Sequence, residues 1–296
     1  MSGDFAEGAG TGASAPPDIS VVVPAYGRPE ALRRLLTALA AQRDVAVEVI
    51  VVDDGSPAPL APTAEPFAAR LDLRVLRQPN AGPAAARNRG AAAARAGVLA
   101  FTDDDCAPEP GWAAAMHAAV AGSSAPIMAA GRTENALQGN PYAETSQAIA
   151  DFIAARAGPD GIIAPSNNIA LPRDAFLDLG GFDTRYPLAA GEDRAFCRTW
   201  VRAGWPIVAV PGARLAHHHD LDLRRFWRQH SNYGRGAALF HATEGAAPFA
   251  PLSRLGFYAA LVASPWRSAG LRGVALAAMS QAAVAHGMYR ARREKG

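Results

Sequence analysis

The chain has 296 residues, of which 50% are hydrophobic, and a formal net charge of +2. Its length and composition are typical of one large globular domain, or of one domain with appendages, and they exclude a largely disordered protein. The small net charge argues against a nucleic-acid partner, because such partners call for a strongly basic surface. The two cysteines, Cys106 and Cys197, have no zinc-site or disulfide spacing and indicate a reducing, cytoplasmic setting.

Residues 1–17 are rich in Gly, Ala and Ser and lack the basic start of a signal peptide, so we expect a flexible leader. From residue 18 onward, β-type runs alternate with amphipathic stretches, which predicts right-handed strand–helix–strand units and a parallel sheet. The first predicted elements are strand 19–23, helix 29–42, strand 47–52, a proline-interrupted helix or loop at 57–70, strand 73–76, helix 83–96 and strand 98–102.

Past residue 107 the pattern is less regular. The elements predicted there are helix 112–121, strand 127–130, a partly helical stretch 133–165, strand 167–170, helix 173–179, helix 194–203, strand 207–210, helix 221–238 and a helical region 251–293. We therefore predict an α/β domain over residues 18–220, with a mostly parallel central sheet flanked by helices, and a helical C-terminal extension over residues 221–296.

The extension contains an uncharged stretch at residues 273–289, which is too short and too polar for a confident membrane span. Basic residues flank it, and they would favour contact with an anionic membrane surface: Arg267, Arg272, Arg290, Arg292, Arg293 and Lys295. Docking of this helix on the catalytic domain is the alternative. The protein is thus expected in the cytoplasm, with peripheral contact to the inner face of the membrane left open.

Two acidic clusters follow predicted buried strands. Asp53 and Asp54 end one run, and residues 103–105 (Asp-Asp-Asp) follow another. The carboxyl ends of parallel strands meet at one edge of the sheet, where open α/β folds bind ligands. A helix cap needs one oxygen and not three successive carboxylates, so the arrangement predicts a site for a metal ion and a nucleotide sugar.

A set of short motifs occurs in a characteristic order along residues 19–240. They are residues 21–26 (VVVPAY), 51–56 (VVDDGS), 80–90 (NAGPAAARNRG), 103–105 (DDD), 167–168 (NN), 180–183 (GGFD) and 191–193 (GED). In this order the chain resembles the family 2 glycosyltransferases of the GT-A type. The resemblance implies an inverting, metal-dependent transfer of a sugar from a nucleotide diphosphate sugar to an acceptor hydroxyl. It leaves open whether the acceptor is a glycan, a lipid or a small molecule.

The resemblance assigns the nucleotide to the ends of the first two strands. Pro24, Ala25 and Tyr26 would receive the flat base, and the carboxylates of Asp53 and Asp54 would accept hydrogen bonds from the nucleoside. A tyrosine at the edge of the core is the alternative for Tyr26.

The helix that begins after Gly82 is expected to place Arg87 and Asn88 in the donor pocket, and its first turn offers unpaired N–H groups to an anion. The alternative is an alanine-rich helix with a solvated Arg87. Farther along, Arg235 is the candidate for contact with the diphosphate, on a segment whose aromatic residues could equally belong to the core.

The acidic triplet resembles the Asp-x-Asp signature of metal-dependent sugar transferases. In an extended chain the first and third side chains point the same way, so Asp103 can serve the ribose or the sugar while Asp105 binds the cation. Asp104 is also assigned to the donor. Carboxylate ligands favour Mn²⁺ or Mg²⁺. His217 is the second candidate for the metal or the diphosphate, with His219 as its competitor.

The resemblance assigns the general base to the motif at residues 191–193, and we choose Asp193, with Glu192 as the close alternative. A helix cap is the other interpretation of these carboxylates. Two other functions compete with sugar transfer. A signalling receiver domain is disfavoured because it would be shorter and needs no second acidic cluster. A catalytically silent module that binds a nucleotide sugar remains the alternative.

Overall fold

The structure is a computed structural model that describes residues 16–155, 164–244 and 255–294. Its centre is an eight-stranded sheet with the order β3-β2-β1-β4-β7-β6-β8-β5. The strands are β1 Ile19–Ala25, β2 Val47–Asp53, β3 Asp72–Arg77, β4 Val98–Thr102, β5 Cys106–Pro108, β6 Met128–Asn135, β7 Asn168–Pro172 and β8 Ile207–His217. Strands β3, β2, β1 and β4 are parallel neighbours, whereas β7 runs antiparallel to both β4 and β6. The predicted α/β class and mostly parallel sheet are confirmed.

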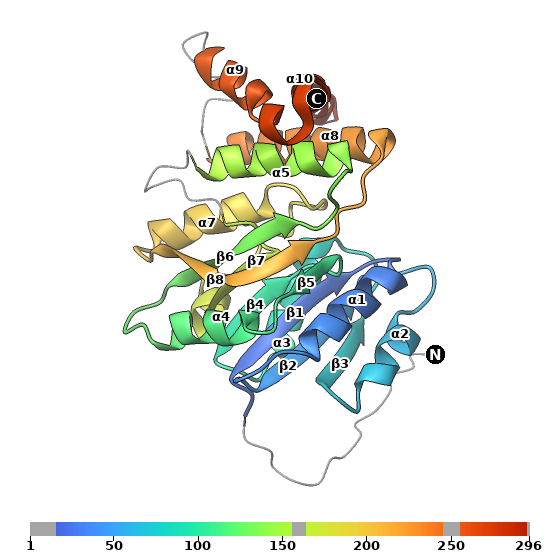
Figure 1. Ribbon diagram of the computed structural model, residues 1–296. Helices are drawn as coiled ribbons and strands as arrows, with labels where there is room; N and C mark the ends of the chain where they lie inside the picture. The colour runs from blue at the N-terminus through green and yellow to red at the C-terminus, as the bar shows by residue number, and fades with distance from the viewer. Residues whose placement is uncertain (1–15, 156–163, 245–254, 295–296) are drawn as a thin grey trace.

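Helices cover both faces of this sheet, and a further layer of helices lies over one end of it (Figure 1). Those flanking the sheet are α1 Pro29–Leu39, α2 Ala61–Ala64 with the 3₁₀ turn η1 Glu65–Phe67, α3 Pro83–Ala93, α4 Trp112–Ala121, α6 Arg173–Asp178 and α7 Glu192–Arg202. The additional layer contains α5 Pro141–Ala154, α8 Leu223–Glu244, α9 Leu255–Ala263 and α10 Trp266–Arg293. The predicted helical C-terminal extension is therefore present.

The central strands β1, β2, β4 and β7 are almost wholly buried, whereas β3, β6 and β8 are partly exposed. Alternate side chains of the central strands enter two different cores. Val21 and Val23 of β1 belong to the core that includes the leucines of α1, while Val22 between them belongs to the core under α3. Helix α3 approaches β1 closely at Gly90, where an added Cβ would lie 2.3 Å from the Val22 side chain. This tight packing fixes the start of α3, and with it Arg87, against the carboxyl end of the sheet.

The strand β8 is longer than the predicted strand 207–210. Its first part pairs with β6 up to Val210, and the pairing resumes at Arg214 after an irregularity that contains Pro211 and Gly212. Proline and glycine act as breakers in sequence reasoning, but here they form a bulge inside one strand, which carries the chain on to His217. The short strand β5 was not predicted at all. Residues 1–15, 156–163, 245–254 and 295–296, which include most of the predicted leader and parts of 133–165 and 251–293, lie outside the described residues.

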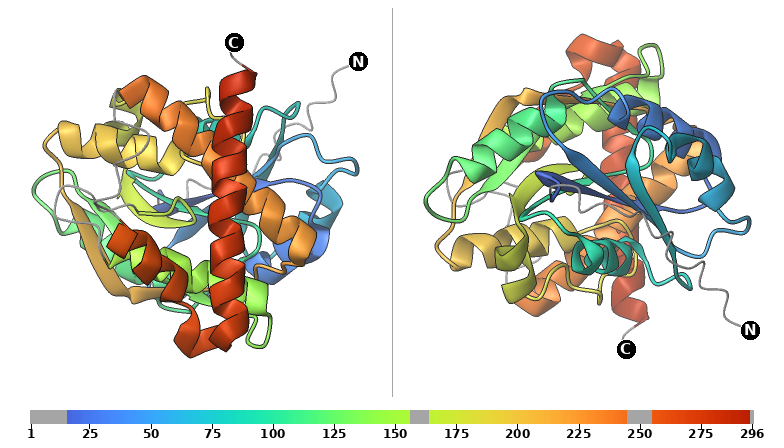
Figure 2. Two further views of the ribbon diagram at one scale, coloured as in Figure 1. Left: turned by 90° about the horizontal axis from the view of Figure 1, so that it is seen from above. Right: turned by 90° about the horizontal axis from the view of Figure 1, so that it is seen from below.

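Seen from above, α10 crosses the whole layer of C-terminal helices and rests on α8 (Figure 2). Two glycines make the close approach possible: an added Cβ would lie 2.0 Å from the Val284 carbonyl oxygen at Gly234, and 1.9 Å from the Ser231 carbonyl oxygen at Gly287. The predicted helical region 251–293 is divided into α9 and α10, and α10 is kinked at Gly270. Among the described helices, none is both long and apolar enough to cross a bilayer.

Candidate active site

The acidic residues meet at the carboxyl edge of the parallel strands, as the sequence predicted. Asp53 is the last residue of β2, and the triplet Asp103, Asp104 and Asp105 directly follows β4. Strand β1 lies between β2 and β4 in the sheet, so its end, Pro24 and Ala25, separates the two acidic clusters.

Asp53 and Asp54 hold the loops around them. Asp53 accepts hydrogen bonds from the backbone N–H groups of Ser56 (2.9 Å) and Leu60 (3.1 Å) and pairs with Arg77 at 2.5 Å. Burial opposes ionisation of Asp53, but these hydrogen bonds and Arg77 outweigh it and lower its pKa. The predicted contact of both residues with a nucleoside remains a prediction, and the loop-fixing role was missed.

The Asp54 carboxylate forms a second support. It accepts hydrogen bonds from the Gln78 side chain at 2.8 Å and from the N–H groups of Ala81 and Gly82, both at 2.9 Å. Through these bonds Asp54 orders the segment that leads into α3. Asp54, which we expect to contact the nucleoside, thus positions α3, the helix that we expect to line the donor pocket.

The extended conformation expected for the acidic triplet is wrong. Residues 103–105 form a turn, closed by a 3.0 Å hydrogen bond from the Cys106 N–H to the Asp103 carbonyl. Alternation along a strand therefore does not decide where the three carboxylates point. Asp103 turns to Arg87, at 2.7 Å, whereas Asp104 and Asp105 turn to Arg28.

Arg28 is a site residue that the sequence reasoning missed. Its Nη1 lies 2.5 Å from Asp105 Oδ2, its Nε donates to Asp104 Oδ2 at 3.2 Å, and its Nη2 makes a further contact with Asp104. Burial raises the pKa of Asp104 to about 7, because the repulsion of Asp105 and Asp103 adds to desolvation and Arg28 only partly offsets it. The sequence does place Arg28 three residues after β1, near the predicted site. An arginine just before a helix is more often solvated, so this position alone did not indicate a site residue.

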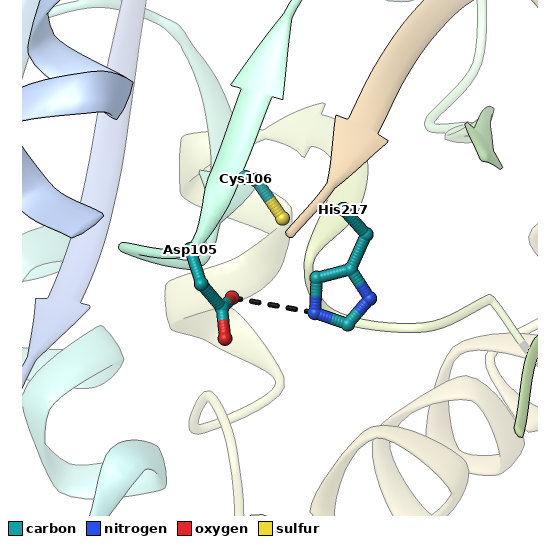
Figure 3. A group of neighbouring side chains, drawn as sticks. All are labelled: Asp105, Cys106 and His217. Carbon is teal, nitrogen blue, oxygen red and sulfur yellow. Dashed lines mark ion pairs between the residues drawn. The ribbon is translucent and has the colours of Figure 1, made fainter. Parts of the chain in front are cut away.

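Asp105, Cys106 and His217 bring three metal-ligating atoms within 4.8 Å of one another (Figure 3). His217 is the last residue of β8, and the β5–β8 pairing sets it opposite Cys106, with its Nε2 3.3 Å from Asp105 Oδ1. Asp105 Oδ1 is buried and, within the described part of the chain, accepts no hydrogen bond. A buried carboxylate oxygen beside an imidazole suits a divalent cation, so these residues fit the predicted metal.

The charges at this point couple Asp105 to His217 more tightly than to His219. Burial alone would lower the pKa of His217, but Asp105 and Asp103 raise it; Asp105 is correspondingly held ionised by His217 and Arg28. His219 stacks on His217 with ring centroids 4.7 Å apart, and burial together with His217 lowers the pKa of His219 to about 4. Burial raises the pKa of the Cys106 thiol, which makes it a poor ligand for a hard cation.

Arg87 is not the solvated residue of the alternative interpretation, because only 2% of it is exposed. Its Nη1 donates to Glu192 Oε1 at 3.0 Å and its Nη2 to Asp103 Oδ1 at 2.7 Å. One guanidinium therefore joins α3, the acidic turn and the start of α7. The neighbouring Asn88 exchanges two hydrogen bonds with the backbone of Phe182, which anchors the loop before α7.

The two candidate bases, Glu192 and Asp193, differ in their surroundings. Glu192 is buried and paired with Arg87, whereas Asp193 is partly exposed and accepts a 2.7 Å hydrogen bond from the N–H of Arg194. Burial and Asp193 raise the pKa of Glu192 to about 7 despite Arg87, and burial also raises the pKa of Asp193. Gly191 occupies the N-cap of α7, so neither carboxylate occupies the capping position.

Two other predicted donor residues lie at the margins of this cluster. Tyr26 is 50% exposed, which fits a platform for a ligand better than a core residue. Arg235 of α8 donates to Glu294 at the end of α10, at 2.7 Å, and the structure does not bring it into the acidic cluster. Tyr233 of α8 is affected by the site more directly: desolvation and the carboxylates of Asp193 and Glu192 raise its pKa to about 12, although Gln229 donates to its hydroxyl at 2.6 Å.

Comparison with known proteins identifies the family. Residues 20–176 match the family model described as glycosyl transferase family 2. The pre-mycofactocin glycosyltransferase of Mycobacterium tuberculosis is 34% identical over 229 residues, a match that covers 75% of this chain and 47% of that protein, so the chain spans about half the length of this relative.

Two solved structures share the fold. The mannosyltransferase PcManGT from Pyrobaculum calidifontis, in complex with GDP-Man and Mn²⁺, has a TM-score of 0.57 at 20% identity and covers 92% of this chain and 76% of its own. The 1–349 fragment of TarS from S. aureus has a TM-score of 0.54 at 17% identity and covers 94% of this chain and 92% of its own. The predicted GT-A type fold is confirmed, and the chain belongs to glycosyl transferase family 2.

Proposed function

We propose that this protein moves a sugar from a nucleotide diphosphate sugar to an acceptor hydroxyl, with inversion at the anomeric carbon and with the help of a divalent cation. The observation that carries the proposal is the convergence at one sheet edge of two arrangements. One is the pair of the buried Asp105 and the partly exposed His217, and the other is the Arg87-linked carboxylate pair of Glu192 and Asp193. The first suits a cation that binds phosphate, and the second suits a base.

Asp105 and His217 are the residues that would hold the cation, Mn²⁺ or Mg²⁺. When bound, such an ion neutralises the charge that develops on a departing diphosphate. PcManGT, which shares the fold, was solved with Mn²⁺ bound, and this supports the choice of cation. Arg28 pairs with Asp104 and Asp105 at the same place, and we propose that it orients these carboxylates toward the diphosphate side of the crevice.

The donor is proposed to lie across the ends of β1, β2 and β4. Pro24, Ala25 and Tyr26 would receive the base, and Asp53, Asp54, Asp103 and Asp104 the nucleoside and sugar; Arg87 and Asn88 shape the pocket through the contacts described above. The GDP-Man of PcManGT and the UDP-GlcNAc bound to a TarS fragment (TM-score 0.55) support a nucleotide sugar as donor. Arg235 remains a candidate for diphosphate contact only if it leaves Glu294.

Asp193 is proposed as the general base. Its partly exposed carboxylate can meet an acceptor hydroxyl, whereas Glu192 is held by Arg87 in the interior. Asp193 would take the proton of the hydroxyl as that oxygen attacks the anomeric carbon opposite the leaving diphosphate. A single displacement of this kind inverts the configuration.

We propose residues 18–220 as the catalytic domain and 221–296 as an extension, in a cytoplasmic protein whose C-terminal helices contact the membrane. The acceptor is a glycan, a lipid or a small molecule; one relative carries the name pre-mycofactocin glycosyltransferase.

The proposal is tested with a panel of nucleotide diphosphate sugars, each incubated with and without Mn²⁺, and with release of nucleoside diphosphate as the readout. We expect one donor to be hydrolysed or transferred in a Mn²⁺-dependent way. A donor that binds in calorimetry but is never turned over, with or without a range of acceptors, would instead identify a silent binding module.

A further inference from the structure

The outward face of α10 is apolar along most of its length. Its exposed positions at helical spacing are apolar between Arg272 and Tyr289: Ala275, Ala278, Ala282 and Ala285, with Leu271 and Tyr289 at the two ends. His286 is also exposed and lies at the edge of this stripe, where its ring contacts Trp227 and Ser231 of α8. Leu271 is 75% exposed and Tyr289 55% exposed, so the two ends of the stripe present large apolar side chains to the outside. The inward face is already used, because Gly287 packs against the backbone of α8.

A second group of exposed apolar side chains lies on α9 and at the beginning of α10. Phe257 and Tyr258 of α9 are exposed, and Trp266 at the start of α10 is 56% exposed. The two helices contact each other and lie together on the outer side of the molecule (Figure 2). Single exposed apolar side chains are common on proteins, but large ones exposed together on neighbouring helices indicate an interaction surface.

The charge on α9 and α10 has one sign. The described residues 255–293 contain no aspartate or glutamate, and they contain five arginines: Arg267, Arg272, Arg290, Arg292 and Arg293. Arg267 and Arg272 lie at one end of the α10 stripe, and the other end carries Arg290, Arg292 and Arg293, all exposed. Glu294, just beyond, is already engaged by Arg235 and Arg290. The surface therefore complements a negatively charged partner.

We propose that the outward face of α9 and α10 binds the surface of a bilayer that contains anionic lipids. The uncharged stripe would enter the headgroup boundary, Trp266 and Tyr289 would lie at its two ends, where interfacial aromatic residues are favoured, and the arginines would pair with lipid phosphates. A helix lying in the plane of the surface agrees with the absence of a spanning helix among the described residues. A protein partner would need an apolar strip with acidic groups at both of its ends. An anionic bilayer offers negatively charged headgroups and apolar chains at every point of its surface.

This inference names the residues and the lipid charge for the membrane contact within the proposed function, but it does not depend on catalysis. The surface is separated from the acidic cluster by α8, whose Gly234 packs against α10 while its Gly236 packs against Ala190 and Gly191, directly before Glu192. Membrane binding and donor turnover can thus be measured independently on the same protein. A protein that turns over a donor but binds no membrane would contradict only this inference, and one that binds membrane but turns over no donor would contradict only the proposed reaction.

The experiment is vesicle flotation of the full chain with phosphatidylcholine alone and with phosphatidylcholine containing phosphatidylglycerol. One variant removes charge (Arg267→Gln, Arg272→Gln and Arg290→Gln) and another removes apolar contact (Trp266→Ser and Leu271→Ser). The matched control, Arg43→Gln with Arg70→Gln, changes exposed charges in the connections before β2 and β3. Thermal unfolding of each variant verifies that it is folded.

We expect wild type and control to float with the phosphatidylglycerol vesicles only, and both α9–α10 variants to bind at least about tenfold more weakly. Binding should also weaken as salt is raised. Equal binding to both vesicle types, or equal binding by the charge variant and the control, would overturn the proposal. So would a dimer in sedimentation that the Trp266→Ser, Leu271→Ser variant abolishes while no vesicle is bound, because that result would assign the face to a second copy of the chain.

Discussion

The strand edge that carries the acidic cluster and the layer of α8 and α10 above it are built in opposite ways. At the strand edge, opposite charges face one another: the half-exposed Arg28 joins the buried Asp104 and Asp105, and the buried Arg87 joins Asp103 and Glu192. In the helical layer, glycines allow the backbones to touch, and most charges lie on the outside.

This difference determines what each region tolerates. A site held by paired charges should respond strongly to the loss of one charge, because the partner left behind stays buried and uncompensated. A layer held by close backbone contact should respond to added volume instead. Four predictions test this contrast, beginning with the largest expected effect.

Asp193→Asn should lower turnover about 10²–10⁴-fold while donor affinity stays nearly unchanged, because an amide keeps the shape of the side chain but cannot accept the proton. Donor affinity is measured by calorimetry and turnover with a working acceptor. Asp174→Asn, on the exposed side of α6, is the control and should behave as wild type. If Glu192→Gln is inactive and Asp193→Asn is not, the base is Glu192, and if both are active the assignment of this motif is wrong.

Arg87→Met should lower the free energy of unfolding by about 3–5 kcal/mol, because Glu192 and Asp103 then lose their shared buried partner. Denaturant unfolding at constant pH measures the change. Arg89→Met, two residues along the same helix at an exposed position, should cost only about 0.5 kcal/mol or less. Equal losses for the two variants would show that paired charge does not hold this edge.

Gly287→Ala should lower the free energy of unfolding by about 1–3 kcal/mol, since the added methyl group would lie 1.9 Å from the Ser231 carbonyl oxygen and must push α10 away from α8. Gly256→Ala in α9, where nothing lies within 4 Å of the added Cβ, should be neutral or stabilising by up to about 1 kcal/mol. Loss of stability in the second variant but not in the first would contradict the proposed packing.

The pH dependence of turnover should show the smallest effect. The base acts only when deprotonated, and because burial raises the pKa of Asp193, activity should fall as pH decreases at values above the ordinary aspartate range. Arg87 lowers the pKa of Asp193, so in Arg87→Met this acid limb of kcat/KM should move to higher pH. An unchanged limb, or one that moves to lower pH, would show that Arg87 does not act on the base as proposed.

Sequence reasoning predicted the strand edge well because its features are local. A buried β-type run followed by carboxylates determines both the strand and the end at which Asp53 and Asp103 emerge, and β4 and α4 have the predicted limits. The same reasoning placed Arg87 beside the site, although not its burial. Helix α1 begins at the predicted residue, Pro29.

Other features depend on contacts between distant segments, which no local pattern reveals. Residues 103–105 form a turn in place of the predicted extended chain, and their carboxylates face Arg87 and Arg28 on other segments. Arg28 reaches Asp105 across the end of β1, and Arg235 meets Glu294 on another helix. Pro211 and Gly212 would be expected to end a strand, so the part of β8 that follows the bulge was not predicted.

The central claim is that Asp105 holds a divalent cation at the edge where the charges converge. Calorimetric titration of Mn²⁺ into the protein, in the presence of UDP or GDP, measures this directly for wild type, Asp105→Ala and the control Asp174→Ala. We predict that wild type and control bind Mn²⁺ equally and that Asp105→Ala binds it at least about tenfold more weakly, because a carboxylate ligand has been removed. Equal Mn²⁺ affinity in all three proteins would contradict the assignment of the metal to Asp105.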